Sequence, residues 1–361
     1  MLHTKRLLAL LLAAVMTLGL FACGTQPVQT AAEEKTDAFP TWNECEALTA
    51  LKGYVEDVTD EQSANFIPVA DRIAVFDMDG TLCGELFPTY LEYLLCAYRC
   101  LDDPDYQADP ELQQIAQVIR EGSKADGTGS FPKDMALQHA YAQAKAFAGL
   151  TPEEFDAYVK KFLDRDADGF RNMKYADSLY VPMTEVVAYL QENGFTTYVV
   201  SGSDRFICRA VACEKLNIPY EHVIGMDVSL RATGQGDEAG VDYQYQTSDK
   251  VVRGDRLLVK NLKMNKVAQI VQEIGRQPVL SFGNSSGDTS MHLYTITDNK
   301  YKSAAFMLIA DDEERDYGNT EKNTKKGEDW KNMVFHVISM KDDFKTIYGY
   351  DVVKTELTYN G

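Results

Sequence analysis

The sequence is poor in positive charge and has few histidines. Lysine and arginine together number 36 against 55 aspartates and glutamates, which leaves a formal net charge of −19, and only 5 histidines are present. Nucleic acids and anionic lipid surfaces are bound through basic residues that neutralise phosphates, so this balance argues against both as partners of the protein body. A phosphate-bearing small molecule would have to be attracted by a local positive site.

Cysteine is present, but in none of the spacings that hold zinc or build a disulfide framework. None of the 7 cysteines forms a Cys-x-x-Cys pair or a cluster with histidine. Cys96 and Cys100 lie on an expected helix, where this spacing is more typical of two small buried side chains than of a bridge. We expect the cysteines that follow Cys23 to be structural. The sequence also contains no internal repeat.

The first 22 residues have the pattern of an export signal. Lys5 and Arg6 precede an apolar run over residues 7–21, which is too short to span a membrane comfortably as a mature helix. The string Leu-Phe-Ala-Cys-Gly over residues 20–24 resembles a bacterial lipobox. This resemblance implies a signal peptide over residues 1–22, lipid attachment at Cys23, and a location on the outer face of the cell membrane. The phenylalanine is unusual in that motif, so plain secretion and an uncleaved anchor remain alternatives.

The rest of the chain predicts an α/β fold with a doubly wound parallel sheet. Residues 23–40 lack periodicity and are expected to form a flexible tether. After them, short apolar runs alternate with helical patterns, which is typical of parallel strands covered by helices on both faces. The expected strands cover residues 73–76, 196–200, 278–282, 304–309 and 334–338, and residues 226–260 are expected to form an antiparallel hairpin.

A long block of helical periodicity interrupts this alternation after the first strand. It covers residues 87–181, and the prolines at positions 110, 132 and 152 stand where helices can begin. We therefore expect a Rossmann-like catalytic core built from residues 41–86 and 182–361, with the helical block inserted as a cap.

Two carboxylates follow the first expected strand. Asp77 and Asp79 stand in the string Val-Phe-Asp-Met-Asp-Gly-Thr-Leu over residues 75–82, at the sheet edge where parallel α/β folds bind ligands. Gly80 permits a sharp turn, which would direct both side chains toward one small volume. One aspartate can attack phosphorus while the second protonates the leaving oxygen. A single Asp-x-Asp pair is more often a solvated turn, so the inference depends on the rest of the chain.

Three further segments carry groups that suit phosphoryl transfer. Ser201 ends an expected strand and precedes Gly202, so a hydroxyl and a backbone N–H can hold phosphoryl oxygens. Lys266 begins an amphipathic helix and would neutralise charge. Asn284 and Asp288 lie in an oxygen-rich loop after another strand, and oxygen ligands of this kind suit Mg²⁺.

In order and spacing, these four segments resemble the motifs of the haloacid dehalogenase superfamily, especially its phosphoserine phosphatase-like branch with a helical cap. The resemblance covers roughly residues 67–350. It implies that Asp77 is the nucleophile and a metal ligand. It also implies that Asp79 is the general acid/base and offers its backbone carbonyl to the metal. Ser201, with Gly202, would bind the phosphate, and Lys266 would stabilise its charge.

One position departs from the pattern of these relatives. The resemblance assigns the metal site to Asp288 and Asn284, but relatives usually carry aspartate where this chain has Asn284. An amide offers an oxygen with less charge. Either Asp288 moves inward to compensate, or the affinity for Mg²⁺ falls.

Asp79 narrows the reaction that the resemblance implies. Dehalogenase members lack this second acid, and ATPase members carry threonine there. Together with export, this favours Mg²⁺-dependent hydrolysis of a small phosphomonoester through an aspartyl phosphate at Asp77. The alternative is a catalytically weak lipoprotein that binds a phosphorylated ligand at the cell surface. The sequence carries no signal of oligomeric state.

Glu85 is a candidate substrate-binding residue. It lies near the position where phosphoserine phosphatases place a glutamate that reads the substrate's ammonium. Phe87, Tyr90 and Leu94 follow at helical spacing with Tyr93 beside them, and a carboxylate next to aromatic faces can seat a cationic head group. This favours phosphoserine, phosphoethanolamine or phosphocholine. The alternative is that the aromatic residues pack the cap and that Glu85 is a solvated hinge acid.

Overall fold

The computed structural model describes residues 37–124 and 129–359. The expected signal peptide, the lipidation site Cys23 and most of the expected tether therefore lie outside the described residues. Within the described ranges, no helix is both long and apolar enough to cross a membrane. The described residues from Ala38 onward form one compact unit.

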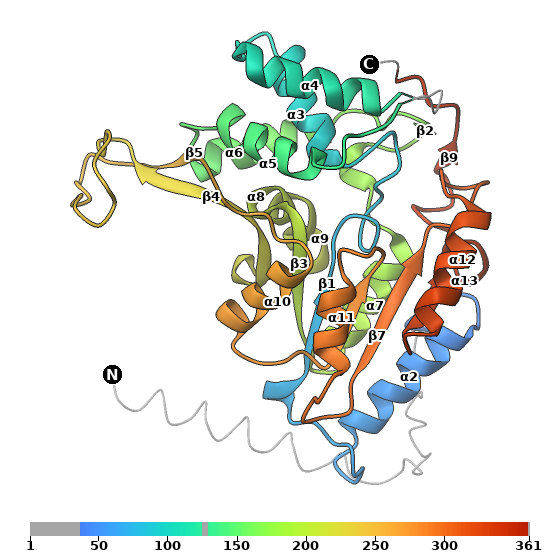
Figure 1. The fold of residues 1–361 in the computed structure, drawn as a ribbon. Coiled ribbons are helices and arrows are strands. Elements are labelled where there is room, and N and C mark those ends of the chain that lie inside the picture. The colour runs from blue at the N-terminus through green and yellow to red at the C-terminus, as the bar shows by residue number, and fades with distance from the viewer. Residues whose placement is uncertain (1–36, 125–128, 360–361) are drawn as a thin grey trace, which may run out of the picture. The chain divides into compact units, whose positions relative to one another are not determined.

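A seven-stranded sheet in the order β5-β4-β3-β1-β6-β7-β8 lies at the centre of this unit (Figure 1). All neighbouring strands are parallel except β4 and β5, which pair antiparallel. The strands are β1 (Ile73–Phe76), β3 (Thr196–Asp204), β4 (Val223–Ala232), β5 (Val251–Val259), β6 (Leu280–Gly283), β7 (Ala304–Ile309) and β8 (His336–Ser339). β1 is buried at every position, which explains its unbroken apolar sequence.

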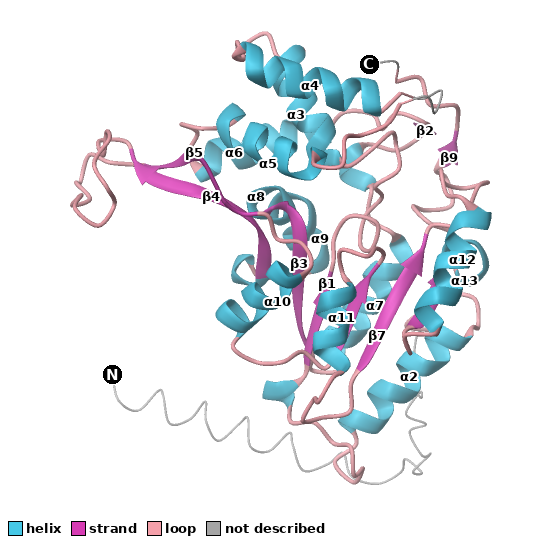
Figure 2. Ribbon diagram, viewed as in Figure 1, coloured by secondary structure: helices cyan, strands magenta, loops and turns pink. Residues whose placement is uncertain are grey.

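Helices cover both faces of the sheet (Figure 2). Phe76 of β1 points into the larger hydrophobic cluster, whereas Val75 points to the other face and packs with Ile270 and Met291. The helices of the core are α2 (Glu46–Thr59), α7 (Val181–Glu192), α8 (Arg205–Cys208), α9 (Glu214–Leu216), α10 (Met264–Gln269), α11 (Thr289–Ile296), α12 (Thr320–Lys331) and α13 (Met340–Asp343). The predicted doubly wound α/β fold is confirmed.

Four helices pack together beyond the carboxyl ends of β1 and β3, and we call them the cap helices (Figure 1). They are α3 (Leu91–Leu101), α4 (Pro110–Gly122), α5 (Met135–Ala146) and α6 (Pro152–Leu163). Pro110 and Pro152 occupy first-turn positions, where the missing N–H costs nothing, but Pro132 precedes α5 rather than starting it. The division into a core and a cap at residues 87 and 181 stays a prediction.

The edge of the sheet is attached to the cap helices. The backbone N–H of Arg253 in β5 donates to the carbonyl of Leu150, and the N–H of Gly149 donates to the carbonyl of Arg253, both at 2.8 Å. Ala140 of α5 also packs against Met226 of β4 in a small apolar cluster. The predicted hairpin is therefore present, and its base joins the cap to the core.

The strand boundaries differ from the expected ones at several places. β3 does not end at Ser201 but continues to Asp204, and its pairing with β4 shifts register after Val200. A second hydroxyl and a third carboxylate are thereby placed at the sheet edge, beyond the predicted pair. β6 and β8 begin at Leu280 and His336, each later than expected.

The C-terminal residues cross from the core toward the cap helices. β9 (Val353–Lys354) pairs antiparallel with β2 (Phe170–Arg171). The Asp168 carboxylate then accepts hydrogen bonds from the backbone N–H groups of Thr358 and Tyr359, each at 3.0 Å. We call residues 352–359 the C-terminal strap.

Asp316 is a fully buried acid that contacts Tyr348, shortly before this strap. Its burial predicts how the stability of the protein depends on pH. Its carboxylate accepts hydrogen bonds from the Tyr348 hydroxyl at 3.0 Å and from the Tyr317 N–H at 2.8 Å. Burial raises the pKa of Asp316 to about 6. Folding therefore favours the protonated acid, so the stability that this acid contributes is present below its unfolded pKa of about 4 and is lost as pH rises through about 6.

Asp316→Asn should flatten this pH dependence, because asparagine does not titrate. Between pH 4 and pH 8 the wild-type free energy of unfolding should fall by up to about 3 kcal/mol more than that of the variant. Urea unfolding at both pH values measures the difference. Parallel pH profiles for the two proteins would show that Asp316 does not titrate in this range.

Candidate active site

Asp77 and Asp79 are brought to one side of a sharp turn at the end of β1. The N–H of Asp77 donates to the carbonyl of Phe282 at 2.9 Å, which extends the pairing with β6. Gly80 then adopts a φ of +79°, and a Cβ at this position would lie 1.9 Å from the side-chain nitrogen of Asn284. Only glycine fits here, because the backbone is left-handed and the Asn284 amide lies against it.

Lys266 lies between two carboxylates at the centre of the site. Its Nζ is 2.5 Å from Asp77 Oδ1 and 2.6 Å from Asp288 Oδ1, and the lysine is 1% exposed. Burial alone would lower the pKa of Lys266, but the two carboxylates outweigh it and raise the pKa. Burial and then the charge of Asp288 raise the pKa of Asp77, while Lys266 opposes the rise. The positive charge of Lys266 thus favours the ionised, nucleophilic form of Asp77 against this rise.

Asp79 is held differently from Asp77. Its Oδ2 accepts a hydrogen bond of 2.6 Å from the Ser203 hydroxyl, and its Oδ1 is buried without a hydrogen-bond partner among the described residues. Burial, and next the charge of Glu92, raise the pKa of Asp79 to about 6. A carboxyl group whose pKa lies closer to neutral pH than usual suits a general acid and base.

The predicted phosphate-binding pair is adjacent to the two aspartates. Ser201 is fully buried, and its hydroxyl accepts a hydrogen bond from the Ser203 N–H at 3.0 Å and lies 3.5 Å from Asp79 Oδ2. Gly202 lines the cavity, and a Cβ there would lie 2.5 Å from the side chain of Leu262. The glycine therefore allows the loop that carries Leu262 to approach the strand end.

Asp288 organises the loop that carries Asn284. Its Oδ2 accepts hydrogen bonds from the Asn284 N–H at 3.1 Å and from the N–H and hydroxyl of Ser285 at 3.0 and 3.1 Å, while Oδ1 contacts Lys266. Burial would raise the pKa of Asp288, but the charge of Lys266 and these hydrogen bonds outweigh it and lower the pKa. The Asn284 amide nitrogen donates to Glu85 Oε1 at 3.1 Å.

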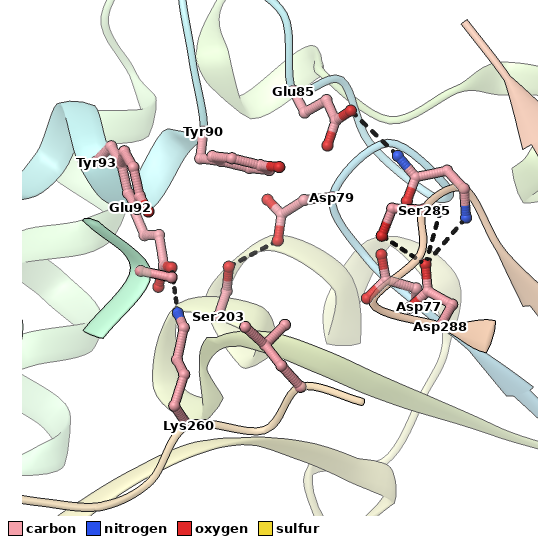
Figure 3. Close-up of a pocket in the computed structure, with 14 residues that line it drawn as sticks. Asp77, Asp79, Glu85, Tyr90, Glu92, Tyr93, Ser203, Lys260, Ser285 and Asp288 are labelled. Carbon is pink, nitrogen blue, oxygen red and sulfur yellow. Dashed lines mark hydrogen bonds and ion pairs between the residues drawn. The ribbon is translucent and has the colours of Figure 1, made fainter. Parts of the chain in front are cut away.

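The predicted residues converge on one cavity of about 170 Å³ between the strand ends and the cap helices (Figure 3). It is lined by Asp77, Asp79, Glu85, Tyr90, Glu92, Tyr93, Ala136, Gly202, Ser203, Lys260, Leu262, Asn284, Ser285 and Asp288. Ser201 and Lys266 lie behind this lining, in contact with Asp79 and Asp77 respectively.

One wall of the cavity is formed by the cap helices and the segment after β5, and its residues were not predicted from the sequence. Glu92 of α3 is buried and accepts a hydrogen bond of 2.9 Å from Lys260 Nζ, which comes from the segment after β5. A neighbouring buried pair joins Arg253 to Asp204 at 2.6 Å. A glutamate inside the apolar stripe of an expected helix was the available signal for Glu92.

The aromatic group predicted near Glu85 divides into two parts. Tyr90 and Tyr93 line the cavity with ring centroids 5.3 Å apart, whereas Phe87 and Leu94 belong to the hydrophobic core. Phe87 precedes α3, so the expected helical spacing does not apply to it. Glu85 itself faces the cavity, and burial followed by the charges of Asp79 and Asp77 raises its pKa to about 8.

Comparison with known protein families identifies this arrangement. A model of haloacid dehalogenase-like hydrolases matches residues 74–291, from β1 through the loop that holds Asp288 into α11. The chain belongs to the haloacid dehalogenase-like hydrolase family. The family membership predicted from the four motifs is therefore confirmed. No curated protein sequence matches this hydrolase.

Several solved structures are similar to this hydrolase at low sequence identity and with TM-scores below 0.5. A conserved protein of unknown function from Anaerococcus prevotii is 14% identical with a TM-score of 0.49, over 81% of this chain and 92% of its own. Cytosolic 5′-nucleotidase IIIB, solved with cytidine, is 13% identical with a TM-score of 0.48, over 88% and 93%. A phosphoserine phosphohydrolase-like protein from Francisella tularensis is 16% identical with a TM-score of 0.39, over 74% and 94%.

The oxygen atoms around Asp77 fit a magnesium ion in this hydrolase. Within residues 37–124 and 129–359, no three His, Cys, Asp or Glu side chains converge as a metal cluster. Mg²⁺, however, needs only one or two carboxylates and otherwise keeps waters or substrate oxygens. Asp77, the backbone carbonyl of Asp79 and the amide oxygen of Asn284 would hold it. Asp288 is already engaged by four donors, so it would support the site through Lys266 and the loop.

Proposed function

We propose that the protein is a Mg²⁺-dependent phosphomonoesterase that forms an aspartyl phosphate at Asp77. The observation that carries this proposal is the arrangement of a buried nucleophilic carboxylate, a lysine 2.5 Å from it, and a second acid two residues on whose pKa is raised to about 6. Membership of a hydrolase family supports the same reaction.

The residues divide the reaction between them. An oxygen of Asp77 attacks phosphorus, the bond from phosphorus to the leaving oxygen breaks, and Asp79 gives its proton to that oxygen. Water then attacks the phosphoaspartate, Asp79 accepts a proton from it, and inorganic phosphate leaves with Asp77 restored. Lys266 and the backbone N–H of Gly202 stabilise the charge on the phosphoryl oxygens. Bound Mg²⁺ would supply Lewis-acid stabilisation of the same charge.

The cavity favours a small substrate whose leaving group is neutral or cationic. Its volume of about 170 Å³ is below the range usual for drug-sized ligands. Five carboxyl groups line it against one lysine, Lys260, which is already paired with Glu92. A second negative charge on the leaving group would be repelled, whereas a cationic head group could lie against Tyr90 and would favour the ionised form of Glu85 beside it. These features support phosphoethanolamine or phosphocholine over phosphoserine, whose leaving group carries a carboxylate.

Phosphate release by the full-length protein from a panel of phosphomonoesters tests the function and the substrate type together. We expect kcat/KM for phosphocholine or phosphoethanolamine to exceed that for an uncharged alkyl phosphate by at least about tenfold. Glu85→Gln should remove most of this preference. A preference below about tenfold, or a preference that is unchanged in Glu85→Gln, would exclude recognition of a cationic head group. Tight binding without phosphate release would favour the catalytically weak binding protein instead.

Removal of the metal should abolish activity. Mg²⁺ should restore it better than Ca²⁺, whose looser coordination holds the reacting groups poorly. Asn284→Asp should lower the Mg²⁺ concentration needed for half-maximal activity, because a carboxylate replaces a neutral amide oxygen. Titration of a chelated sample with each metal measures this. Full activity in the presence of chelator would exclude the metal assignment.

We also propose that the protein is exported and anchored by a lipid on Cys23. The basic pair Lys5 and Arg6, the apolar run over residues 7–21 and the lipobox-like string support this proposal. Metabolic labelling with palmitate in a bacterial host should mark the wild-type protein and not Cys23→Ala. Absence of label from both proteins would leave plain secretion or an uncleaved anchor, and equal label on both would place the lipid elsewhere.

A further inference from the structure

We infer that Ser203 is the positioning residue of Asp79: its hydroxyl holds the general acid in the orientation from which it protonates the leaving oxygen. This inference rests on the proposed phosphatase function. Ser203 lies outside the pair that the sequence suggested for phosphate binding. It becomes part of the site because β3 continues past Ser201.

Ser203 makes the one short hydrogen bond to the Asp79 side chain among the described residues. Its hydroxyl donates to Oδ2 at 2.6 Å, a length typical of a hydroxyl bonded to a carboxylate. The Ser201 hydroxyl is 3.5 Å from the same oxygen, which is too far for a comparable bond. Without the Ser203 hydroxyl, the Asp79 side chain would lose the short hydrogen bond that fixes the orientation of its carboxyl group.

Ser203 is itself held rigidly. Its N–H donates to the Ser201 hydroxyl at 3.0 Å, and its side chain is 4% exposed. The next residue, Asp204, is fixed by Arg253 at 2.6 Å and donates its N–H to Glu92 at 3.1 Å. The hydroxyl is therefore anchored by both the end of β3 and the buried ion pairs of the cap wall.

The two carboxylate oxygens of Asp79 have different surroundings and therefore different roles. Oδ2 is anchored by Ser203, while Oδ1 has no partner among the described residues and lies on the side of Tyr90 (Figure 3). Oδ1 is thus the oxygen that carries the proton to the leaving group. An anchored donor meets the leaving oxygen at a fixed distance, and misplacement by about 1 Å can cost about a hundredfold in rate.

Leaving-group dependence distinguishes positioning of the acid from a merely structural role. In the full-length protein, Ser203→Ala should lower kcat/KM for an alkyl phosphate, which reports phosphoryl transfer to Asp77, by about ten- to a hundredfold. For 4-nitrophenyl phosphate, whose leaving group needs no proton, kcat/KM should fall less than about threefold. Ser203→Thr, which keeps the hydroxyl, should restore most of the alkyl phosphate rate. Ser123→Ala removes another buried serine hydroxyl, at the C-cap of α4, and should change neither rate.

A double-mutant cycle with Asp79→Asn completes the test. Ser203→Ala should cause no further loss of alkyl phosphate turnover once Asp79 is asparagine. Equal losses on the two substrates, or losses that multiply in the double variant, would overturn the inference. A second cycle with Asp79→Ala is measured by urea unfolding, which needs no turnover. The shift in midpoint caused by Ser203→Ala should largely disappear in the Asp79→Ala background, which has no oxygen to accept the hydroxyl, and an undiminished shift contradicts the inference. Absence of phosphate release from the wild type would count against the proposed function alone.

Discussion

Asp77→Asn should lower kcat by at least about a thousandfold, because asparagine has the shape of the nucleophile without its negative charge. The fold should survive. Lys266 keeps its second ion pair, with Asp288 at 2.6 Å, and the Asp77 N–H bond to β6 belongs to the backbone. Steady-state phosphate release, with the thermal unfolding midpoint of the same samples, measures both outcomes.

Asp255→Asn is the matched control for this substitution. Asp255 is an exposed aspartate on β5, outside the residues that line the cavity, so its replacement should leave kcat and the unfolding midpoint unchanged. Rapid-quench trapping adds a direct readout, because wild-type protein should accumulate acid-stable label from a ³²P-phosphomonoester and Asp77→Asn should not. Turnover by Asp77→Asn within tenfold of the wild type would place the nucleophile elsewhere.

Arg253→Met should lower the free energy of unfolding by about 3–5 kcal/mol. The guanidinium of Arg253 is 0% exposed and pairs with Asp204, which is 1% exposed, at 2.6 Å. Methionine preserves much of the side-chain volume but leaves the Asp204 carboxylate buried without its cation. Urea unfolding at neutral pH measures this loss of unfolding free energy.

Two variants separate burial of charge from loss of packing. In Asp204→Asn/Arg253→Met the carboxylate is gone as well, so most of the lost stability should return. Lys145→Met breaks the exposed pair with Glu111 and should cost less than about 1 kcal/mol. If Arg253→Met were no more costly than Lys145→Met, the Arg253 pair would be hydrated in solution rather than buried.

The sequence was most informative where chemistry and strand ends coincide. Asp77, Asp79, Lys266 and Asp288 were found because each follows or faces the end of an apolar strand, and parallel topology brings such ends together. The placement of Asn284 against Gly80 and Glu85 was not predictable. It depends on a contact between loops about two hundred residues apart, which local patterns do not encode.

The cap wall could not be derived from local patterns for a related reason. Glu92 and Lys260 are individually ordinary charged residues, and only the packing of α3 against the segment after β5 makes them a buried pair. The role of Ser203 was not predicted, because the Ser201-Gly202 pair is typical of a strand end and β3 continues past it. The register shift after Val200 is set by pairing with β4, and that partner is not visible in the sequence of β3 alone.

The C-terminal strap has a consequence for the order in which the protein is made. β2 pairs with β9, and Asp168 accepts hydrogen bonds from the backbone of Thr358 and Tyr359, so both contacts need residues that are synthesised long after the cap helices. The final attachment of the cap helices on this side therefore waits until residues 353–359 have left the ribosome. A nascent chain that stalls before residue 352 therefore contains every proposed catalytic residue. It still lacks the C-terminal strap that attaches this side of the cap helices.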